Sequence, residues 1–268
     1  MTETHHRPGQ ARRPDSSGTR RISLVIPAYN EEEFLPATLE HLAAARREMP
    51  PGLELEVIVS DDGSGDRTRE LARALADRVV VPAAGDRTGP GAARNRGAAA
   101  ASGELLVFID ADGRLQDPPR FLARAWQAFA DDPKLAAATC RLAVEPELAT
   151  RAECWLHRLQ DVVIYLENRL GIHTAGGWCQ VVPRRLFERV GGYNQDLVVS
   201  QDVDLFLKLG RQGKTRLLWD LRVFESPRRY RQQGLLRTYL ARLRNSVAVT
   251  LGRRSRSRGY RPSRPRRH

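Results

Sequence analysis

A short segment in the first half of the chain, residues 104–113, constrains the fold more than any other. Residues Leu105–Ile109 are all apolar, which is the pattern of a strand buried on both faces in the middle of a parallel sheet. Two carboxylates, Asp110 and Asp112, follow directly, and open α/β sheets bind their ligands at such strand ends. These carboxylates can hold a divalent cation that is shared with substrate phosphates, or they can simply shape a turn.

Strands and helices are expected to alternate before this segment. Three further apolar runs predict strands, and the intervening residues carry helical patterns. The expected strands are 22–26, 55–59 and 79–81, and the expected helices are 31–47, 66–76 and 91–101. This order predicts an α/β fold with a mostly parallel, Rossmann-like sheet that is doubly wound by helices.

Polar residues follow three of the expected strands. Asn30 comes after the first, Asp61 and Asp62 come after the second, and Asp110 and Asp112 come after the fourth. Because the carboxyl ends of parallel strands meet at one edge of a sheet, these side chains are expected to form one ligand-binding edge.

The second half of the chain has a less regular pattern. Helices are expected at 118–130, 147–170, 184–189 and 203–209, and strands at 135–139, 178–182, 217–219 and 221–224. Within the helix 147–170, Trp155, Leu159 and Val163 share one side.

The net charge of +12 is concentrated at the two ends of the chain. Residues 253–268 contain eight arginines and no acid, residues 1–21 carry +3, and about +1 is left for residues 22–252. Both ends are expected to be disordered, the first as a polar leader without the apolar core of a signal peptide. A basic tail can bind anionic membrane or nucleic acid, and we favour the simpler interpretation of a solvated tail.

The number of cysteines and the hydropathy of the chain indicate in which cellular compartment it is expected to work. The three cysteines, Cys140, Cys154 and Cys179, are widely spaced, which argues against a disulfide framework or a zinc site and for a reducing compartment. No run of about 18 apolar residues occurs, so no membrane span is expected. A cytoplasmic location, with contact to the inner face of the membrane, is the resulting prediction.

Several short motifs follow one another in a definite order between residues 22 and 230. They are Pro27-Ala28-Tyr29-Asn30-Glu31, Asp61-Asp62-Gly63-Ser64, Gly91-Ala92-Ala93-Arg94-Asn95, Asp110-Ala111-Asp112, Gly176-Gly177, Val190-Gly191-Gly192-Tyr193 and Gln201-Asp202. In this order they resemble the family 2 inverting glycosyltransferases of the GT-A fold. The resemblance implies an enzyme that transfers a sugar from a nucleotide-sugar donor.

The resemblance assigns the donor pocket residue by residue. Ala28, Tyr29 and Glu31 are implied to lie around the nucleotide base, and Asp62 is implied to hydrogen-bond it. An aromatic face packs well against a base, and a carboxylate can accept from an imide N–H.

Arg94 and Asn95 are implied to border the same pocket, with Asp110 near the ribose. Asp112 is implied to bind a divalent metal, Mg²⁺ or Mn²⁺, that neutralises the departing diphosphate.

The acceptor side follows from the same resemblance. Asp202 takes the place of the general base, and Gln201 stands where the family has a glutamate, which leaves the acceptor contacts of that position open. Asp204 is a competing carboxylate, but the motif aligns on Asp202. Gly176 and Gly177 are implied to lie beside the acceptor and the donor sugar.

The resemblance also bears on the product and the acceptor. Processive members carry Gln-x-x-Arg-Trp and membrane spans, whereas this chain has Ser-Pro-Arg-Arg-Tyr at 226–230, which predicts a single transfer per encounter. Arg228 and Arg229 are candidates for contact with a diphosphate or an anionic acceptor, and a solvated basic turn is the alternative. The acceptor itself, a glycan, a lipid carrier or a small molecule, is left open.

The expected organisation is a catalytic domain at 22–230, with a nucleotide-binding half at 22–113 and an acceptor-binding half at 114–230. An amphipathic helix is expected at 231–252, where Arg237, Arg242 and Arg244 lie among apolar residues. That helix can contact an anionic membrane surface or pack on the catalytic domain.

Three other functions are weighed against this one. A dinucleotide-dependent oxidoreductase and a nucleotidyltransferase would each need a glycine-rich loop after the first strand, which has Pro27-Ala28-Tyr29-Asn30 instead. A non-catalytic protein that binds nucleic acid through its tail is the remaining alternative, and we do not expect nucleic acid among the partners.

Overall fold

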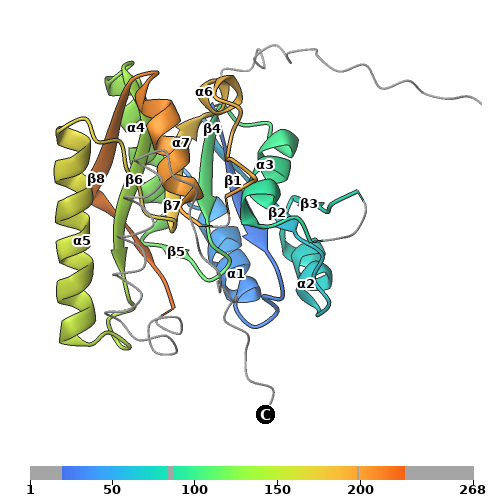
Figure 1. Cartoon of the computed structure of the whole chain (residues 1–268). Helices are drawn as coiled ribbons and strands as arrows, with labels where there is room; N and C mark the ends of the chain where they lie inside the picture. The colour runs from blue at the N-terminus through green and yellow to red at the C-terminus, as the bar shows by residue number, and fades with distance from the viewer. Residues whose placement is uncertain (1–19, 84–86, 198, 227–268) are drawn as a thin grey trace, which may run out of the picture.

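The computed structural model describes residues 20–83, 87–197 and 199–226, which form one sheet with helices on both faces (Figure 1). The strands are β1 Arg20–Ala28, β2 Leu53–Asp61, β3 Arg78–Val80, β4 Leu105–Ile109, β5 Arg114–Leu115, β6 Leu135–Ala143, β7 Cys179–Pro183 and β8 Lys214–Phe224. The helices are α1 Leu35–Arg46, α2 Thr68–Leu75, α3 Pro90–Ala100, α4 Pro118–Asp131, α5 Arg151–Arg169, α6 Arg184–Arg189 and α7 Gln201–Gly210.

The sheet order is β3-β2-β1-β4-β7-β6-β8-β5. The first four strands in this order are mutually parallel, as the alternation of strands and helices predicted. The sheet then becomes mixed, because β7 runs antiparallel to both β4 and β6, and β6 and β8 are parallel to each other.

Two apolar cores lie on the two faces of this sheet. Alternate residues of β4 separate between them, with Leu105, Val107 and Ile109 on one side and Leu106 and Phe108 on the other. The first core includes residues of α1 and α4, and the second includes residues of α3, α6 and α7. The unbroken apolar run of β4 is therefore explained by burial on both faces.

Some element boundaries differ from those expected. Strand β1 begins at Arg20, so Arg20 and Arg21 do not belong to a leader, because Arg20 N–H donates to Gly52 C=O (3.0 Å) and Arg21 pairs with Glu54 (2.7 Å). Helix α1 begins at Leu35 rather than at residue 31. The backbone N–H of Glu31 instead donates to Thr68 Oγ1 (2.8 Å), which holds it outside the helix.

Two other differences lie in the second half. Helix α5 begins at Arg151, four residues later than expected, because Thr150 and Glu153 form a capping box there. The expected strands 217–219 and 221–224 are one strand, β8. Its register with β6 shifts between Leu218 and Arg222, so the three intervening residues bulge from the ladder.

Helix α5 buries a polar face. Its buried residues are Glu153, His157, Asp161, Ile164 and Asn168. Burial raises the pKa of Asp161 to about 7, although it accepts a hydrogen bond from Leu142 N–H (3.2 Å) and lies near arginines that act in the opposite direction. Trp155, Leu159 and Val163 do share one side, as expected, but that side is exposed.

The expectations for Arg228, Arg229, the helix at 231–252, the Arg-rich tail and the leader up to residue 19 lie outside the described residues.

Candidate active site

The strand pairing brings four chain segments to one edge of the sheet. Ala28 at the end of β1 pairs with Asp61 at the end of β2, and Ile109 at the end of β4 pairs with Cys179 at the start of β7. The antiparallel direction of β7 therefore places the segment Gly176–Trp178 at the edge where the three parallel strands end. The predicted convergence of the strand-end residues on one edge follows from this pairing.

The loops after β1 and β2 are tied to each other. Asn30 has a left-handed backbone (φ 54°), its N–H donates to Ser64 Oγ (3.0 Å), and its Oδ1 accepts from Gly65 N–H (2.9 Å). Ala28 is buried and Tyr29 is half-buried beside them, with the guanidinium of Arg87 4.2 Å from the centre of the Tyr29 ring. The aromatic face that is expected to pack a base thus carries an arginine, a group that also pairs with phosphate.

Asp62 is buried and anchors the start of α3. Its carboxylate accepts from the backbone N–H groups of Thr88 (3.0 Å) and Gly89 (2.7 Å), and Arg96 lies 3.3 Å away. Its neighbour Asp61 forms an ion pair with Arg69 (2.9 Å). Asp62 therefore shapes the wall of the expected base pocket, and its hydrogen bond to a base stays a prediction.

Arg94 is the centre of a charged cluster that joins the two halves of the chain. Its Nη2 donates to Asp110 Oδ1 at 2.7 Å, and its guanidinium lies 5.4 Å from the centre of the Tyr193 ring. Burial alone would lower the pKa of Arg94, but the negative charges of Asp110 and Asp202 outweigh it and the pKa is raised. The structure thus brings Arg94, Asp110 and Asp202 within electrostatic reach of one another.

Asn95, the next residue of α3, holds the loop that carries Tyr193. Its Oδ1 accepts from Tyr193 N–H (2.8 Å) and its Nδ2 donates to Tyr193 C=O (2.9 Å). Gly192 has φ +65°, and a Cβ there would lie 2.5 Å from Asn95 Oδ1, so only glycine fits beside this clamp. Asn95 therefore fixes the backbone of Tyr193 through both atoms of its side-chain amide. Its expected contact with the donor stays a prediction.

Burial raises the pKa of the Tyr193 phenol well above its usual range, and the nearby carboxylates add to this effect although Arg94 opposes it. Its hydroxyl donates to Gln180 Oε1 (2.7 Å). Tyr193 is therefore a neutral hydrogen-bonding and packing residue, unsuited to act as an acid or base.

Asp202 lies in the first turn of α7 and is half-buried. The carboxylate faces Gly177, since a Cβ on that glycine would lie 3.9 Å from Asp202 Oδ2. The competing carboxylate, Asp204, instead pairs with Lys208 one turn along the helix (2.9 Å). The two acids therefore have different surroundings, and the choice of Asp202 as the base stays a prediction.

Gln201 is buried, and its side chain donates to Leu197 C=O and packs against Gly91. The amide therefore fixes the entry into α7. Its expected contact with an acceptor is untested.

Asp112 is half-buried at the end of β4. Across the described ranges, no group of three or more His, Cys, Asp and Glu side chains is placed to hold a metal ion. Magnesium often takes only one or two protein carboxylates and completes its shell with water and substrate phosphates. The residues present fit a cation held jointly with a diphosphate, and they do not form a cage of protein ligands.

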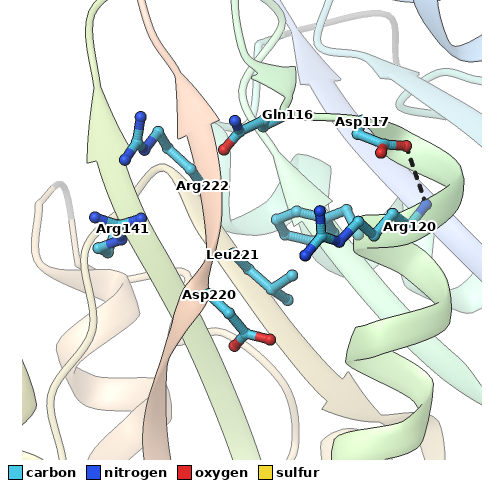
Figure 2. Close-up of a pocket in the computed structure, with 8 residues that line it drawn as sticks. Gln116, Asp117, Arg120, Arg141, Asp220, Leu221 and Arg222 are labelled. Carbon is cyan, nitrogen blue, oxygen red and sulfur yellow. Dashed lines mark hydrogen bonds between the residues drawn. The ribbon is translucent and has the colours of Figure 1, made fainter.

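A separate hollow of about 290 Å³ lies in the half of the chain that is expected to bind the acceptor, between α4 and the strands β6 and β8 (Figure 2). It is lined by Gln116, Asp117, Arg120, Phe121, Arg141, Asp220, Leu221 and Arg222.

Arg141 and Arg222 are register partners on adjacent strands of this hollow, and neither forms an ion pair with any described residue. Burial, and then the positive charge of Arg222, lowers the pKa of Arg141, whose buried Nε has no hydrogen-bond partner in the described part of the chain. Two like charges placed opposite each other on a sheet repel. The carboxylate of Asp161 on α5 lies within electrostatic reach of both arginines and opposes this repulsion, and a bound anion would oppose it further.

Residues 23–191 match the model of the family described as glycosyl transferase family 2. The chain belongs to this family. It therefore carries a glycosyl transferase family 2 domain, and its α/β fold is of the GT-A type, as the resemblance implied.

Curated relatives carry lipid-phosphate names. The undecaprenyl-phosphate 4-deoxy-4-formamido-L-arabinose transferase of Pseudomonas aeruginosa is 28% identical over 211 residues, which are 77% of this chain and 58% of that protein. The protein of the same name from Pseudomonas paraeruginosa is 40% identical over 116 residues, 40% of this chain and 33% of its own. The matched residues thus span 58% of the first relative's length and 33% of the second's.

Solved structures show the same fold. The mannosyltransferase PcManGT of Pyrobaculum calidifontis, in complex with GDP-Man and Mn²⁺, has a TM-score of 0.63 at 24% identity, covering 87% of this chain and 66% of that one. TarS 1–349 of S. aureus, in complex with UDP, has a TM-score of 0.59 at 18% identity, covering 86% and 65%. No helix in the described part of this family member is long and apolar enough to cross a bilayer.

Some residues of the site escaped the sequence analysis. Tyr193 was noted only as part of a motif, although its position directly after two glycines, and next to Arg94 in space, gives it a structural role. Arg141 and Arg222 carry no local signal, because they come together only through the register of β6 and β8.

The two adjacent glycines before β7 provide a matched test of the site. A Cβ on Gly176 would lie 1.9 Å from the Trp178 ring, whereas a Cβ on Gly177 meets only Asp202 Oδ2 at 3.9 Å. We expect Gly176→Ala to lower the thermal midpoint by several degrees, because overpacking costs roughly 1–3 kcal/mol. Gly177→Ala should leave the midpoint unchanged and lower kcat/KM for the acceptor. Equal midpoints for the two variants would contradict the packing described for Gly176.

Proposed function

We propose that this protein is a non-processive, inverting glycosyltransferase that moves a sugar from a nucleoside diphosphate to an acceptor oxygen, with Asp202 as the general base. The observation that carries the proposal is the cluster of Arg94, Asp110 and Asp202, which unites the end of β4 with the start of α7. The donor's diphosphate would lie toward Asp112, and the acceptor toward Gly177 and Asp202.

The reaction is a single displacement. The acceptor oxygen forms a bond to C1 of the sugar while the bond from C1 to the diphosphate oxygen breaks, and the configuration at C1 inverts. Asp202 takes the proton of an acceptor hydroxyl, and its place in the first turn of α7 favours the ionised form that this step needs. A divalent cation at Asp112, when bound, supplies charge neutralisation of the departing diphosphate.

Arg94 has a supporting role in this scheme. Its ion pair with Asp110 fixes the orientation of the carboxylate that is expected beside the ribose. Its positive charge also lies within electrostatic reach of Asp202.

Asp202→Asn should abolish most turnover while donor binding survives. Loss of a general base typically lowers a rate by about 10²–10⁴-fold. The measurement is turnover with a nucleotide sugar chosen by a thermal-shift panel of nucleoside diphosphates with Mn²⁺, together with the anomeric proton coupling of the product.

Asp204→Asn is the matched control, because this carboxylate lies on the same helix and pairs with Lys208. It should retain most turnover. A product with retained configuration at C1 would contradict the inverting mechanism. A larger loss of turnover in Asp204→Asn than in Asp202→Asn would contradict the assignment of Asp202 as the base.

Asp112→Asn should remove the metal dependence of nucleotide binding as well as turnover. In the parent, Mn²⁺ should increase the thermal stabilisation by a nucleoside diphosphate, since the cation and the diphosphate share ligands. In the variant, stabilisation by the nucleoside diphosphate should be the same with and without Mn²⁺. A full Mn²⁺ effect in Asp112→Asn would show that the cation is held elsewhere.

We further propose that the acceptor carries a phosphate, as the names of the relatives state for those proteins. The arginine pair in the hollow of the acceptor half supports this, since guanidinium groups bind phosphate with paired hydrogen bonds. A phosphate monoester has its second pKa near about 6 and is mostly dianionic at neutral pH. A dianionic phosphate oxygen has no proton to lose, so the large loss predicted for Asp202→Asn applies to an acceptor hydroxyl, and to a phosphate acceptor only below about pH 6, where the phosphate carries a proton.

Arg141→Gln and Arg222→Gln should each raise KM for a polyprenyl phosphate by about tenfold or more, since hydrogen bonds to charged groups contribute roughly 1.5–3 kcal/mol. KM for the nucleotide sugar should stay unchanged. Arg120→Gln, on α4 at the other side of the hollow, is the control and should have a smaller effect. Equal activity of all three variants with the lipid phosphate and with its dephosphorylated alcohol would exclude a phosphate site here.

A further inference from the structure

Helix α5 exposes an apolar stripe on the side opposite its buried face. Trp155 is 65% exposed, Leu166 51% and Leu170 76%, and Leu159, Val162 and Val163 are exposed as well. With successive residues about 100° apart, these six side chains fall within roughly 100° of arc, along about 22 Å of helix. The face of α5 that meets β6 and β8 is mostly polar. An ordinary surface helix instead buries its apolar face and exposes its polar one.

The charges that border the stripe are all positive. Arg151, Arg158 and Arg169 are exposed and, by the same helical geometry, lie together along one flank of the stripe. The acids of the helix are withdrawn from this surface. Glu153 and Asp161 are buried, and Glu167 is half-buried and accepts from Thr174 Oγ1 (2.7 Å).

The arginine flank leads into a run of aromatic rings. Arg169 lies 6.0 Å from the centre of the Tyr165 ring, and Tyr165 meets Trp219 edge to face at 5.7 Å. Trp219, itself 39% exposed, carries Arg141 at 5.5 Å. Arg169, Tyr165, Trp219 and Arg141 thus form a continuous series of contacts that connects the apolar stripe to the arginine hollow.

We propose that the exposed face of α5 is a membrane-contact surface that lies in the interface of a bilayer containing anionic lipid. An apolar stripe with a basic flank is the arrangement by which helices lie in the plane of such an interface. Tyrosine, tryptophan and arginine at its border match the level of the lipid head groups. A neutral lipid surface would offer no negative charge to the arginines on this flank. We therefore favour a bilayer that contains anionic lipid.

This surface is independent of the chemistry proposed above, although it would bring the arginine hollow to the level of lipid phosphates. It is also distinct from the helix expected at 231–252, because it is formed entirely by described residues.

Sedimentation of the full chain with vesicles tests the proposal. The vesicles contain phosphatidylglycerol and phosphatidylcholine at about 3:7, or phosphatidylcholine alone, because the anionic lipid attracts basic segments. The double substitution Leu159→Gln/Leu166→Gln should reduce binding by about 10- to 100-fold, since two large apolar side chains no longer enter the lipid. Val81→Gln, at an apolar position with 40% exposure outside α5, should bind like the parent.

Arg158→Gln/Arg169→Gln should reduce binding to the anionic vesicles and have little effect on phosphatidylcholine alone. Full binding by Leu159→Gln/Leu166→Gln would overturn the proposal, because another part of the chain would then carry the attachment.

A fluorescent probe identifies what covers the face. Cys154, the exposed thiol, is replaced by serine, and an environment-sensitive dye is placed on Leu166→Cys; Cys140 and Cys179 are buried. The emission should shift to the blue when anionic vesicles are added. An emission that is already blue without lipid would overturn the proposal, and gel filtration would then assign the cover to a second copy or to the chain's own remaining segment.

Discussion

The ion pair between Arg94 and Asp110 is the contact on which the geometry of the site depends. A buried guanidinium without a partner is costly, and breaking a buried pair by removing one partner typically costs roughly 3–5 kcal/mol. In this chain the pair also joins separate elements, since Arg94 lies on α3 and Asp110 follows β4. Tyr193 and Asp202 are then arranged around the same guanidinium. The position of the candidate base is therefore coupled electrostatically to the strand end that is expected to hold the donor.

A second constraint is the reversal of strand direction at β7. The parallel half of the sheet presents only the ends of β1, β2 and β4 at the ligand edge. Because β7 runs antiparallel to β4, the residues that precede β7 lie at this same edge. Gly177 is one of them, and it faces Asp202 beside the ends of the parallel strands. The two halves of the chain thus share one continuous sheet, and the proposed transfer site lies where the strand direction changes.

The sequence alone predicted those parts of the structure that depend on local pattern. The strand Leu105–Ile109 was predicted with its observed boundaries, because an unbroken apolar run next to two carboxylates leaves little choice. Helix α1 was predicted too long, since the backbone N–H groups of Glu31 and Glu32 at its expected start donate to Thr68, at the start of α2, and to Asp66 before it. The pairing of Arg141 with Arg222 could not be predicted, because it depends on a register shift between two distant strands.

In helix α5 the apolar pattern of the sequence does not predict which side is buried. Periodicity placed Trp155, Leu159 and Val163 on one side, but it could not say which side the sheet would take. The buried side is set by hydrogen bonds instead: Asp161 accepts from the backbone of β6, and Asn168 joins Thr215 on β8 to the backbone at Thr174. A helix held to its sheet by polar contacts leaves its apolar residues for another environment. Because the charges on that outer surface are all arginines, the environment that satisfies both the leucines and the arginines is an interface that is apolar on one side and anionic on the other.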